Sequence, residues 1–231
     1  MANARQQSAL RTRVASLDRR RILLGLELSI FAIVVPTGAA YLRGSVNPTV
    51  VELLVLVLGL LAVFTAAEGG FSLLGQFRQA LKRSDLIAVG ALFSCATLAL
   101  IAWMLAVAPQ RLFAMPSTET SAWLTLILLY PFTSALPQEL AFRTLFFHRY
   151  RSLLPSRPWL AVAINAALFG FAHIIYRNPV SVLLTCLLGV LLGYRYLRTR
   201  SLWLVWIEHT LYGELVFTVG LGHYFLLNPP H

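Results

Sequence analysis

Charge is scarce in this sequence, and acidic charge most of all. Nine of its 231 residues are Asp or Glu, against 19 Lys or Arg, and charged residues make up 12% of the chain. Apolar residues make up 58%, and the mean hydropathy is +0.73. Soluble domains contain about 25% charged and about 45–50% apolar residues. The composition therefore excludes an ordinary soluble domain and predicts an integral membrane protein with several spans.

Cysteine is also rare. Cys95 and Cys186 both lie in apolar runs and form no CxxC pair, which argues against a disulfide framework or a thiolate metal site. We expect two core cysteines. The chain shows no internal repeat and no matched pair of broken helices, and this counts against an inverted-repeat transporter. The first apolar run lacks a small-residue cleavage site, so we expect a retained span rather than a signal peptide.

Runs of about twenty apolar residues predict membrane-spanning helices. They lie near 22–42, 49–67, 85–108, 121–147, 158–176, 180–197 and 201–227. The fourth and the last are long enough to break or tilt, so we expect an all-α transmembrane bundle of about seven to eight spans. We divide the chain into a basic tail, 1–21, and a single helical domain, 22–231.

The basic residues alternate from loop to loop. Fifteen of them lie in the N-terminal tail and in the second, fourth and sixth loops, namely Arg5, Arg11, Arg13, Arg19, Arg20, Arg21, Arg78, Lys82, Arg83, Arg149, Arg151, Arg157, Arg195, Arg198 and Arg200. The opposite loops hold three, Arg43, Arg111 and Arg177. This bias predicts a cytoplasmic N-terminus. We expect the basic charge to meet anionic lipid headgroups, and we expect no nucleic-acid partner.

Polar residues within the later spans stand out, because a charge near the bilayer centre costs about 2.5–3.5 kcal/mol on insertion scales and tends to mark function. Gln138, Glu139 and Arg143 lie within the fourth predicted span. Glu139 and Arg143 are four residues apart, so they share one helix face and can pair. Pro137 favours the first turn of a helix, so we expect a fresh helix to begin there.

Two further groups have helical spacing. They are Asn165, Phe169 and His173 in the fifth predicted span, and Glu208, His209, Tyr212 and Gly213 in the last. Intervals of four place the first group on one helix face. Gly189 and Gly193 form a GxxxG that favours close helix packing. Four aromatic residues are expected at the membrane interfaces: Tyr130, Trp159, Tyr176 and Tyr194.

A carboxylate and two imidazoles on three helices have the chemistry that peptide hydrolysis requires. A base that activates water contributes about 10²–10⁴ in rate, and each oxyanion donor contributes about 10²–10³. Glu139, His173 and His209 can supply both. The same residues also allow purely structural roles. Glu139 and Arg143 can form a structural ion pair, and each His can be a packing residue. Glu208 can be a second acid, or a partner of Arg143 or of a backbone group.

The three groups together resemble the motifs of the CPBP family, the CAAX-processing and bacteriocin-processing intramembrane endopeptidases, also called Abi. That family shows Glu-Glu-x-x-x-Arg, Phe-x-x-x-His and His-x-x-x-Asn. The resemblance covers about 121–227, and implies that Glu139 and His173 activate water, Arg143 orients the acid and His209 stabilises the oxyanion, without a cofactor.

Two departures matter: Gln138 stands in place of the first Glu, and Gly213 in place of Asn. Asn165 or Tyr212 is a candidate for the missing amide donor.

The resemblance implies an intramembrane endopeptidase of a bacterial inner membrane, acting on a peptide or protein near a membrane anchor. Three alternatives stay open. His173, His209 and a carboxylate also form a plausible zinc set, although HExxH is lacking. Gln138 and Gly213 favour a non-catalytic immunity or assembly protein on the same fold. A proton-coupled carrier is the last.

Overall fold

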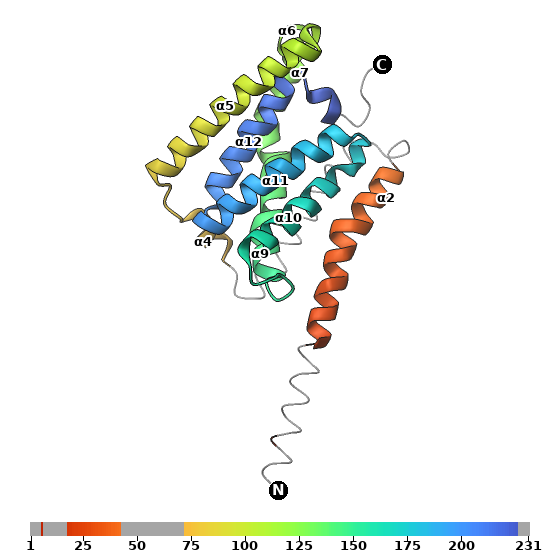
Figure 1. Cartoon of the computed structure of the whole chain (residues 1–231), viewed down its shortest axis with the longest axis vertical. Coiled ribbons are helices and arrows are strands. Elements are labelled where there is room, and N and C mark those ends of the chain that lie inside the picture. Colours follow the sequence, from red (N-terminus) through yellow and green to blue (C-terminus); the bar gives the residue numbers. More distant parts are fainter. Residues whose placement is uncertain (1–5, 7–17, 43–71, 226–231) are drawn as a thin grey trace.

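The computed structural model describes residues 6, 18–42 and 72–225 (Figure 1). Every element assigned within these ranges is a helix, which confirms the all-α class. The predicted second span, 49–67, lies outside the described residues.

Four described helices are long and apolar enough to cross a membrane, and they indicate an integral membrane protein. They are Asp18–Tyr41, which ends in η1 (Ile30–Val34) and α2 (Val35–Tyr41); α5 (Arg83–Val107); Pro158–Tyr176, made of α10 (Pro158–Ala172) and η5 (His173–Tyr176); and α11 (Pro179–Thr199). They coincide with the first, third, fifth and sixth predicted spans, and the first begins before the predicted boundary at residue 22.

The segment that holds Gln138, Glu139 and Arg143 is helical without a break. It consists of α7 (Thr120–Tyr130), the π-helix η3 (Pro131–Ala135), α8 (Leu136–Glu139), the π-helix η4 (Leu140–Leu145) and α9 (Phe146–Arg149). The prediction that a fresh helix begins near Pro137 is therefore wrong. Prolines interrupt the α-helical hydrogen-bond ladder, and the π-turns absorb the interruption without ending the helix.

The last long helix, α12 (Leu202–Thr218), ends earlier than the predicted limit at 227. Gly220 has φ +94, a conformation that glycine adopts readily, and it turns the chain into the 3₁₀ helix η6 (Gly222–Phe225). Shorter helices complete the described fold: α4 (Leu73–Phe77), η2 (Pro109–Arg111) and α6 (Ala114–Thr118).

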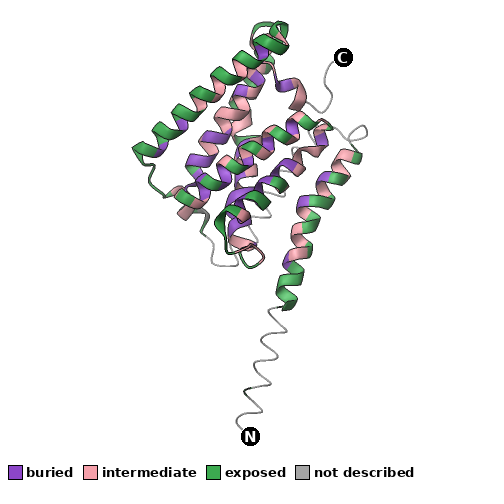
Figure 2. Ribbon diagram, in the orientation of Figure 1, coloured by how far each residue is buried: buried purple, intermediate pink, exposed green. Residues whose placement is uncertain are grey.

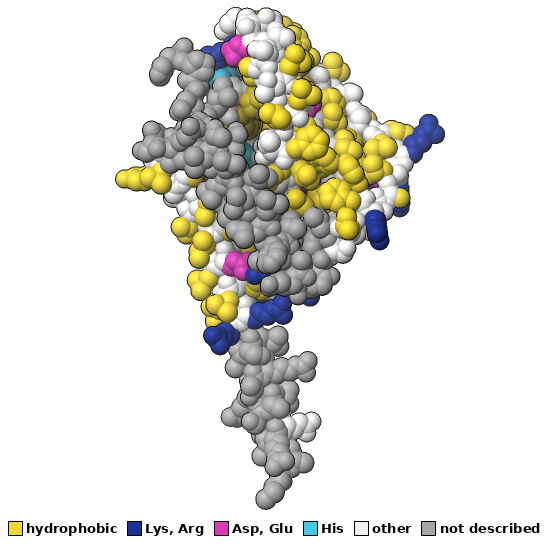
Figure 3. Space-filling model, turned by 180° about the vertical axis from the view of Figure 1, so that it is seen from behind, with side chains coloured by type: hydrophobic (Ala, Val, Ile, Leu, Met, Phe, Trp, Pro, Cys, Tyr) yellow, Lys and Arg dark blue, Asp and Glu magenta, His cyan; other side chains and the backbone are white. Residues whose placement is uncertain are grey.

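Burial is concentrated in the second half of the chain. Figure 2 shows buried residues along α10, α11 and α12, whereas α5 and the first helix are largely exposed. The exposed side chains of α5 include Leu86, Ile87, Leu98 and Trp103, as expected for a lipid-facing helix. Figure 3 shows the face of the molecule turned away from the reader in Figure 1, and a broad hydrophobic area on this face has basic side chains at its edges.

Helices α10 and α11 pack closely because their contact surface is glycine-rich. A Cβ atom at Gly189 would lie 2.9 Å from Cα of Ala166, and one at Gly193 would lie 3.3 Å from Oδ1 of Asn165. The predicted packing role of this GxxxG is confirmed. Both cysteines are free, but the prediction that they are core residues is wrong, because Cys95 is exposed and Cys186 is only partly buried.

Ion pairs and hydrogen bonds tie the basic ends of the helices together. Arg149 makes two hydrogen bonds to Glu27, at 2.5 and 2.6 Å, and the hydroxyl of Tyr150 donates to the same carboxylate. Arg198 pairs with Asp85 at 2.6 Å. The start of the first helix therefore lies beside the end of α9, and the start of α5 beside the end of α11.

Candidate active site

A buried ion pair forms the base of the site. Arg143 Nε lies 3.2 Å from Glu139 Oε2, and neither side chain is exposed. Asn165 on α10 completes the arrangement: its Oδ1 accepts from Arg143 Nη1 at 2.6 Å, and its Nδ2 donates to the Phe142 carbonyl at 2.6 Å. Buried charges need such partners, because an unpaired one carries a large desolvation cost.

The other carboxylate oxygen of Glu139 reaches α12. Its Oε1 lies 2.8 Å from Nδ1 of His209, which is 2% exposed. A carboxylate at this position accepts a hydrogen bond from Nδ1–H of His209. Nε2 of His209 therefore remains available for other partners. The acid and the imidazole therefore form a connected pair, with Arg143 behind the acid.

His173 is oriented by its own helix. Its Nδ1 lies 2.7 Å from the Phe169 carbonyl, which can only accept, so Nδ1 carries the proton. In the neutral ring Nε2 is then a hydrogen-bond acceptor. His173 follows directly on the end of α10, where the chain tightens into η5.

Phe169 holds these groups together. Its ring centroid lies 4.9 Å from that of His173 and 5.7 Å from that of His209, edge to face in both cases. The guanidinium carbon of Arg143 lies 4.7 Å from the same ring, within the range of a cation–π contact. Phe169 is fully buried, so it sets the positions of both imidazoles.

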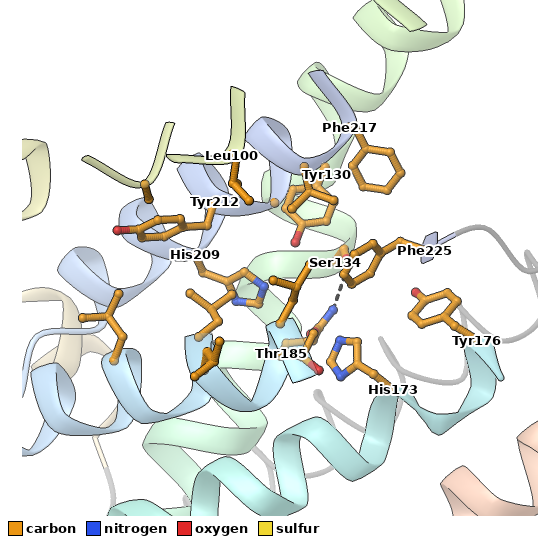
Figure 4. Close-up of a pocket in the computed structure, with 18 of the residues that line it drawn as sticks. Leu100, Tyr130, Ser134, His173, Tyr176, Thr185, His209, Tyr212, Phe217 and Phe225 are labelled. Atoms are coloured by element: carbon orange, nitrogen blue, oxygen red, sulfur yellow. Dashed lines mark hydrogen bonds between the residues drawn. The ribbon is translucent and has the colours of Figure 1, made fainter. Parts of the chain in front are cut away.

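A cavity of about 350 Å³ opens beside the two imidazoles. Its polar wall comprises Tyr130, Ser134, Gln138, His173, Tyr176, Thr185, His209 and Tyr212, and the remainder is mostly apolar side chains of α5, α11 and α12, together with Gly213. Figure 4 shows the rings of His173 and His209 both directed into this space.

Glu139 does not line the cavity, although the family resemblance implied that it activates water together with His173. It is fully buried behind His209. Gln138 lines the cavity instead, with its Nε2 2.8 Å from Ser134 Oγ. Its Oε1 is buried and makes no hydrogen bond in the structure.

Neither candidate for the missing amide donor faces the imidazoles. Both polar atoms of Asn165 are used by Arg143 and the Phe142 carbonyl. Tyr212 lines the cavity, but its hydroxyl points away from His209 (Figure 4).

Two residues that we expected at the membrane interface, Tyr130 and Tyr176, line the cavity. Tyr130, Ser134 and Gln138 follow one another at intervals of four. The helical spacing that identified the histidine stripe could therefore have found this face of the helix as well.

A second buried ion pair joins α11 to α12. Two nitrogens of the Arg195 guanidinium, Nε and Nη2, donate to the Glu208 carboxylate, and Nη2 lies 2.7 Å from Oε1. The suggestion that Glu208 is a second acid or a partner of Arg143 is therefore wrong. Arg195, which we assigned to a loop, lies within α11 and is buried.

Among the residues that the structure describes, no three His, Cys, Asp or Glu side chains are grouped closely enough to hold a metal ion. Both oxygens of Glu139 already face His209 and Arg143.

The fold and the cavity define a class: helical membrane proteins with a buried acid–imidazole pair at an internal cavity. The family follows from comparison. Residues 120–213 match the family model described as Type II CAAX prenyl endopeptidase Rce1-like, which confirms the resemblance to the CPBP/CAAX protease family that the three motifs carry. The comparisons with curated proteins and with solved structures give no match. The family points to a protease and suggests intramembrane endopeptidase activity.

Proposed function

We propose that this protein is an intramembrane endopeptidase of a bacterial inner membrane, with its N-terminus in the cytoplasm. Its substrate would be a peptide or protein whose scissile bond lies near a membrane anchor. The observation that carries the proposal is the pair of imidazoles in the cavity wall, one of them bonded to a buried carboxylate. The mostly apolar cavity beside them suits an apolar part of such a substrate.

In this proposal His209 is the general base. Its Nε2 takes a proton from water as the oxygen attacks the peptide carbonyl, and the Glu139 carboxylate at Nδ1 compensates the positive charge of the imidazolium. Arg143 positions Glu139 through the contact at 3.2 Å. His173, whose Nε2 can accept, orients the same water. The proton on His209 then passes to the leaving amine.

This division of roles differs from the one that the family resemblance implied. Glu139 acts through His209 rather than on water, because it is fully buried and does not line the cavity.

The test uses the full chain in proteoliposomes with a panel of peptides that carry an apolar anchor, one of them a prenylated CAAX peptide. Cleavage in H₂¹⁸O should place one heavy oxygen in the new carboxylate, as hydrolysis requires. His173→Ala and His209→Ala should each lower kcat by about 10²–10⁴ while the protein stays folded. Undiminished cleavage in both variants would remove the proposal.

A metal-dependent protease stays an alternative to be tested in the same assay. Because both oxygens of Glu139 are occupied by His209 and Arg143, we expect chelator treatment to leave the cleavage rate unchanged. Loss of cleavage on chelation, with recovery on adding zinc, would favour the zinc site.

Gln138 gives specific support to a second candidate function, a non-catalytic membrane immunity or assembly protein. An amide rather than a carboxylate lines the cavity at this position. Gln138→Glu separates the two candidates. Cleavage by the natural chain supports the protease, whereas cleavage that appears only in Gln138→Glu supports a binding protein on a protease fold.

A further inference from the structure

Tyr130 places a phenol in the cavity wall beside His209. Its ring centroid lies 6.1 Å from that of His209 and 6.2 Å from that of Phe217. Figure 4 shows its hydroxyl directed into the cavity, toward His209 and Ser134, whereas the hydroxyl of Tyr212 is directed the opposite way.

Gly213 explains how the phenol reaches this position. A Cβ atom built on Gly213 would overlap the hydroxyl oxygen and two ring carbons of Tyr130. Any side chain at residue 213 would therefore push the Tyr130 ring out of its place. Glycine within a helix costs about 1 kcal/mol relative to alanine, and the close approach of Tyr130 accounts for its presence inside α12.

Two other polar groups of the cavity wall are engaged within their own helical segments. The Thr185 hydroxyl donates to the Ser181 carbonyl at 2.6 Å, and Gln138 Nε2 donates to Ser134. The Nδ1–H group of each imidazole donates a hydrogen bond to another residue, so in the neutral rings the Nε2 atoms are hydrogen-bond acceptors. The site so described has two acceptors for water and needs a donor for the developing negative charge.

We propose that the Tyr130 hydroxyl is that donor, a catalytic residue that hydrogen-bonds the carbonyl oxygen of the scissile peptide as it becomes an oxyanion. This inference rests on the proposed function. When water adds to the carbonyl, the C=O π electrons move to oxygen, and the phenol O–H stabilises the oxyanion without losing its proton. The bond reverts when the C–N bond breaks and the amine leaves with the proton held by His209.

The test compares Tyr130→Phe with the natural chain in the proteoliposome assay. Removing one oxyanion donor should lower kcat by about 10²–10³ and change KM little. Tyr41→Phe is the matched control, because Tyr41 is 83% exposed at the end of α2, and it should keep the natural kcat. Gly213→Ala should lower kcat as well. In the double variant Tyr130→Phe/Gly213→Ala the two losses should not add, since both act through one hydroxyl.

The outcomes separate this inference from the proposed function. A natural kcat in Tyr130→Phe, alongside inactive His173→Ala, overturns the Tyr130 assignment and leaves the protease in place. A larger loss in Tyr176→Phe or Tyr212→Phe than in Tyr130→Phe also overturns it, by giving the donor role to that residue. A natural chain that cleaves none of the peptides overturns both.

Discussion

Glu139 contacts two residues, and the two contacts differ in kind. Toward His209 it is a hydrogen-bond acceptor at 2.8 Å, and toward Arg143 it is a counter-ion at 3.2 Å. A role in chemistry depends on the first contact, and a role in stability depends on the second. Substitutions that change one charge or both can therefore distinguish a catalytic acid from a structural ion pair.

We predict that Glu139→Gln lowers kcat by about 10²–10⁴, because a neutral amide cannot compensate the imidazolium of His209. The same change leaves the buried Arg143 without its counter-ion and should lower the free energy of unfolding by about 3–5 kcal/mol. Peptide cleavage and thermal unfolding in detergent measure the two effects.

The double variant Glu139→Gln/Arg143→Gln removes both charges and serves as the control. It should regain part of the lost stability, because no unpaired charge remains, but none of the activity. Recovery of cleavage together with stability would instead make Glu139 and Arg143 a structural pair only.

At this scale the sequence predicted which side chains would be near one another, but not which would face the cavity. Gln138 and Glu139 are neighbours in a helix, so they point in directions about 100° apart and only one can line the cavity. The π-turns η3 and η4 on either side shift the helical phase. The prolines show where the hydrogen-bond ladder is interrupted but not that π-turns absorb the interruption, so the sequence could not show that Gln138 rather than Glu139 lines the cavity.

The packing of α10 against α11 includes a contact between Gly189 and Ala166 that leaves no room for an added Cβ atom. We predict that Gly189→Ala destabilises the protein by about 1–3 kcal/mol, because the new Cβ would lie 2.9 Å from the Ala166 backbone and the helices must separate. Gly90→Ala on α5 is the matched control. A Cβ at Gly90 meets nothing within 4 Å, so this change should be neutral or slightly stabilising.

Melting temperatures in one detergent compare these two variants directly. Equal melting temperatures for Gly189→Ala and the natural protein would show that α10 and α11 adjust without cost. Because α10 carries Asn165, Phe169 and His173, a separation should also lower the cleavage rate of Gly189→Ala, while Gly90→Ala keeps it.

The pair formed by Arg195 and Glu208 fastens α11 to α12 beside His209. We predict that Arg195→Met or Glu208→Gln alone costs about 3–5 kcal/mol, since each leaves a buried group without its partner. The double variant should cost less than the sum of the two. Chemical unfolding of the four proteins in detergent gives the coupling energy, and strict additivity would show that the two side chains do not interact in solution.

The long helices could be predicted because their ends carry clear signals. α11 begins after Asn178, whose side chain accepts from Ser181 N, and has a proline in its first turn. Pro131 and Pro137 gave the same kind of signal inside a continuous helix, where it was misleading. The Arg195–Glu208 pair was missed because residues 13 apart on two helices show no periodic relation in the sequence.

Among the residues that the structure describes, most basic side chains lie at one end of the molecule. Arg149 and Arg198 are held there by Glu27 and Asp85, while Arg111 and Arg177 lie at the other end, where Arg111 contacts His223 and Arg177 contacts the Ala40 carbonyl. From the positive-inside rule we expect the first end to face the cytoplasm. This arrangement supports the orientation that the loop charges predicted.

We predict that Ser156→Cys, in the loop after α9, is labelled by a membrane-impermeant maleimide only after the membrane is opened, whereas Ser117→Cys in α6 is labelled in intact spheroplasts. Both serines are exposed and lie at opposite ends of the bundle. Cys95 and Cys186 are first replaced by alanine, so each variant carries one thiol. The reverse labelling pattern would invert the orientation of the cavity, and with it the side of the membrane from which water reaches His173 and His209.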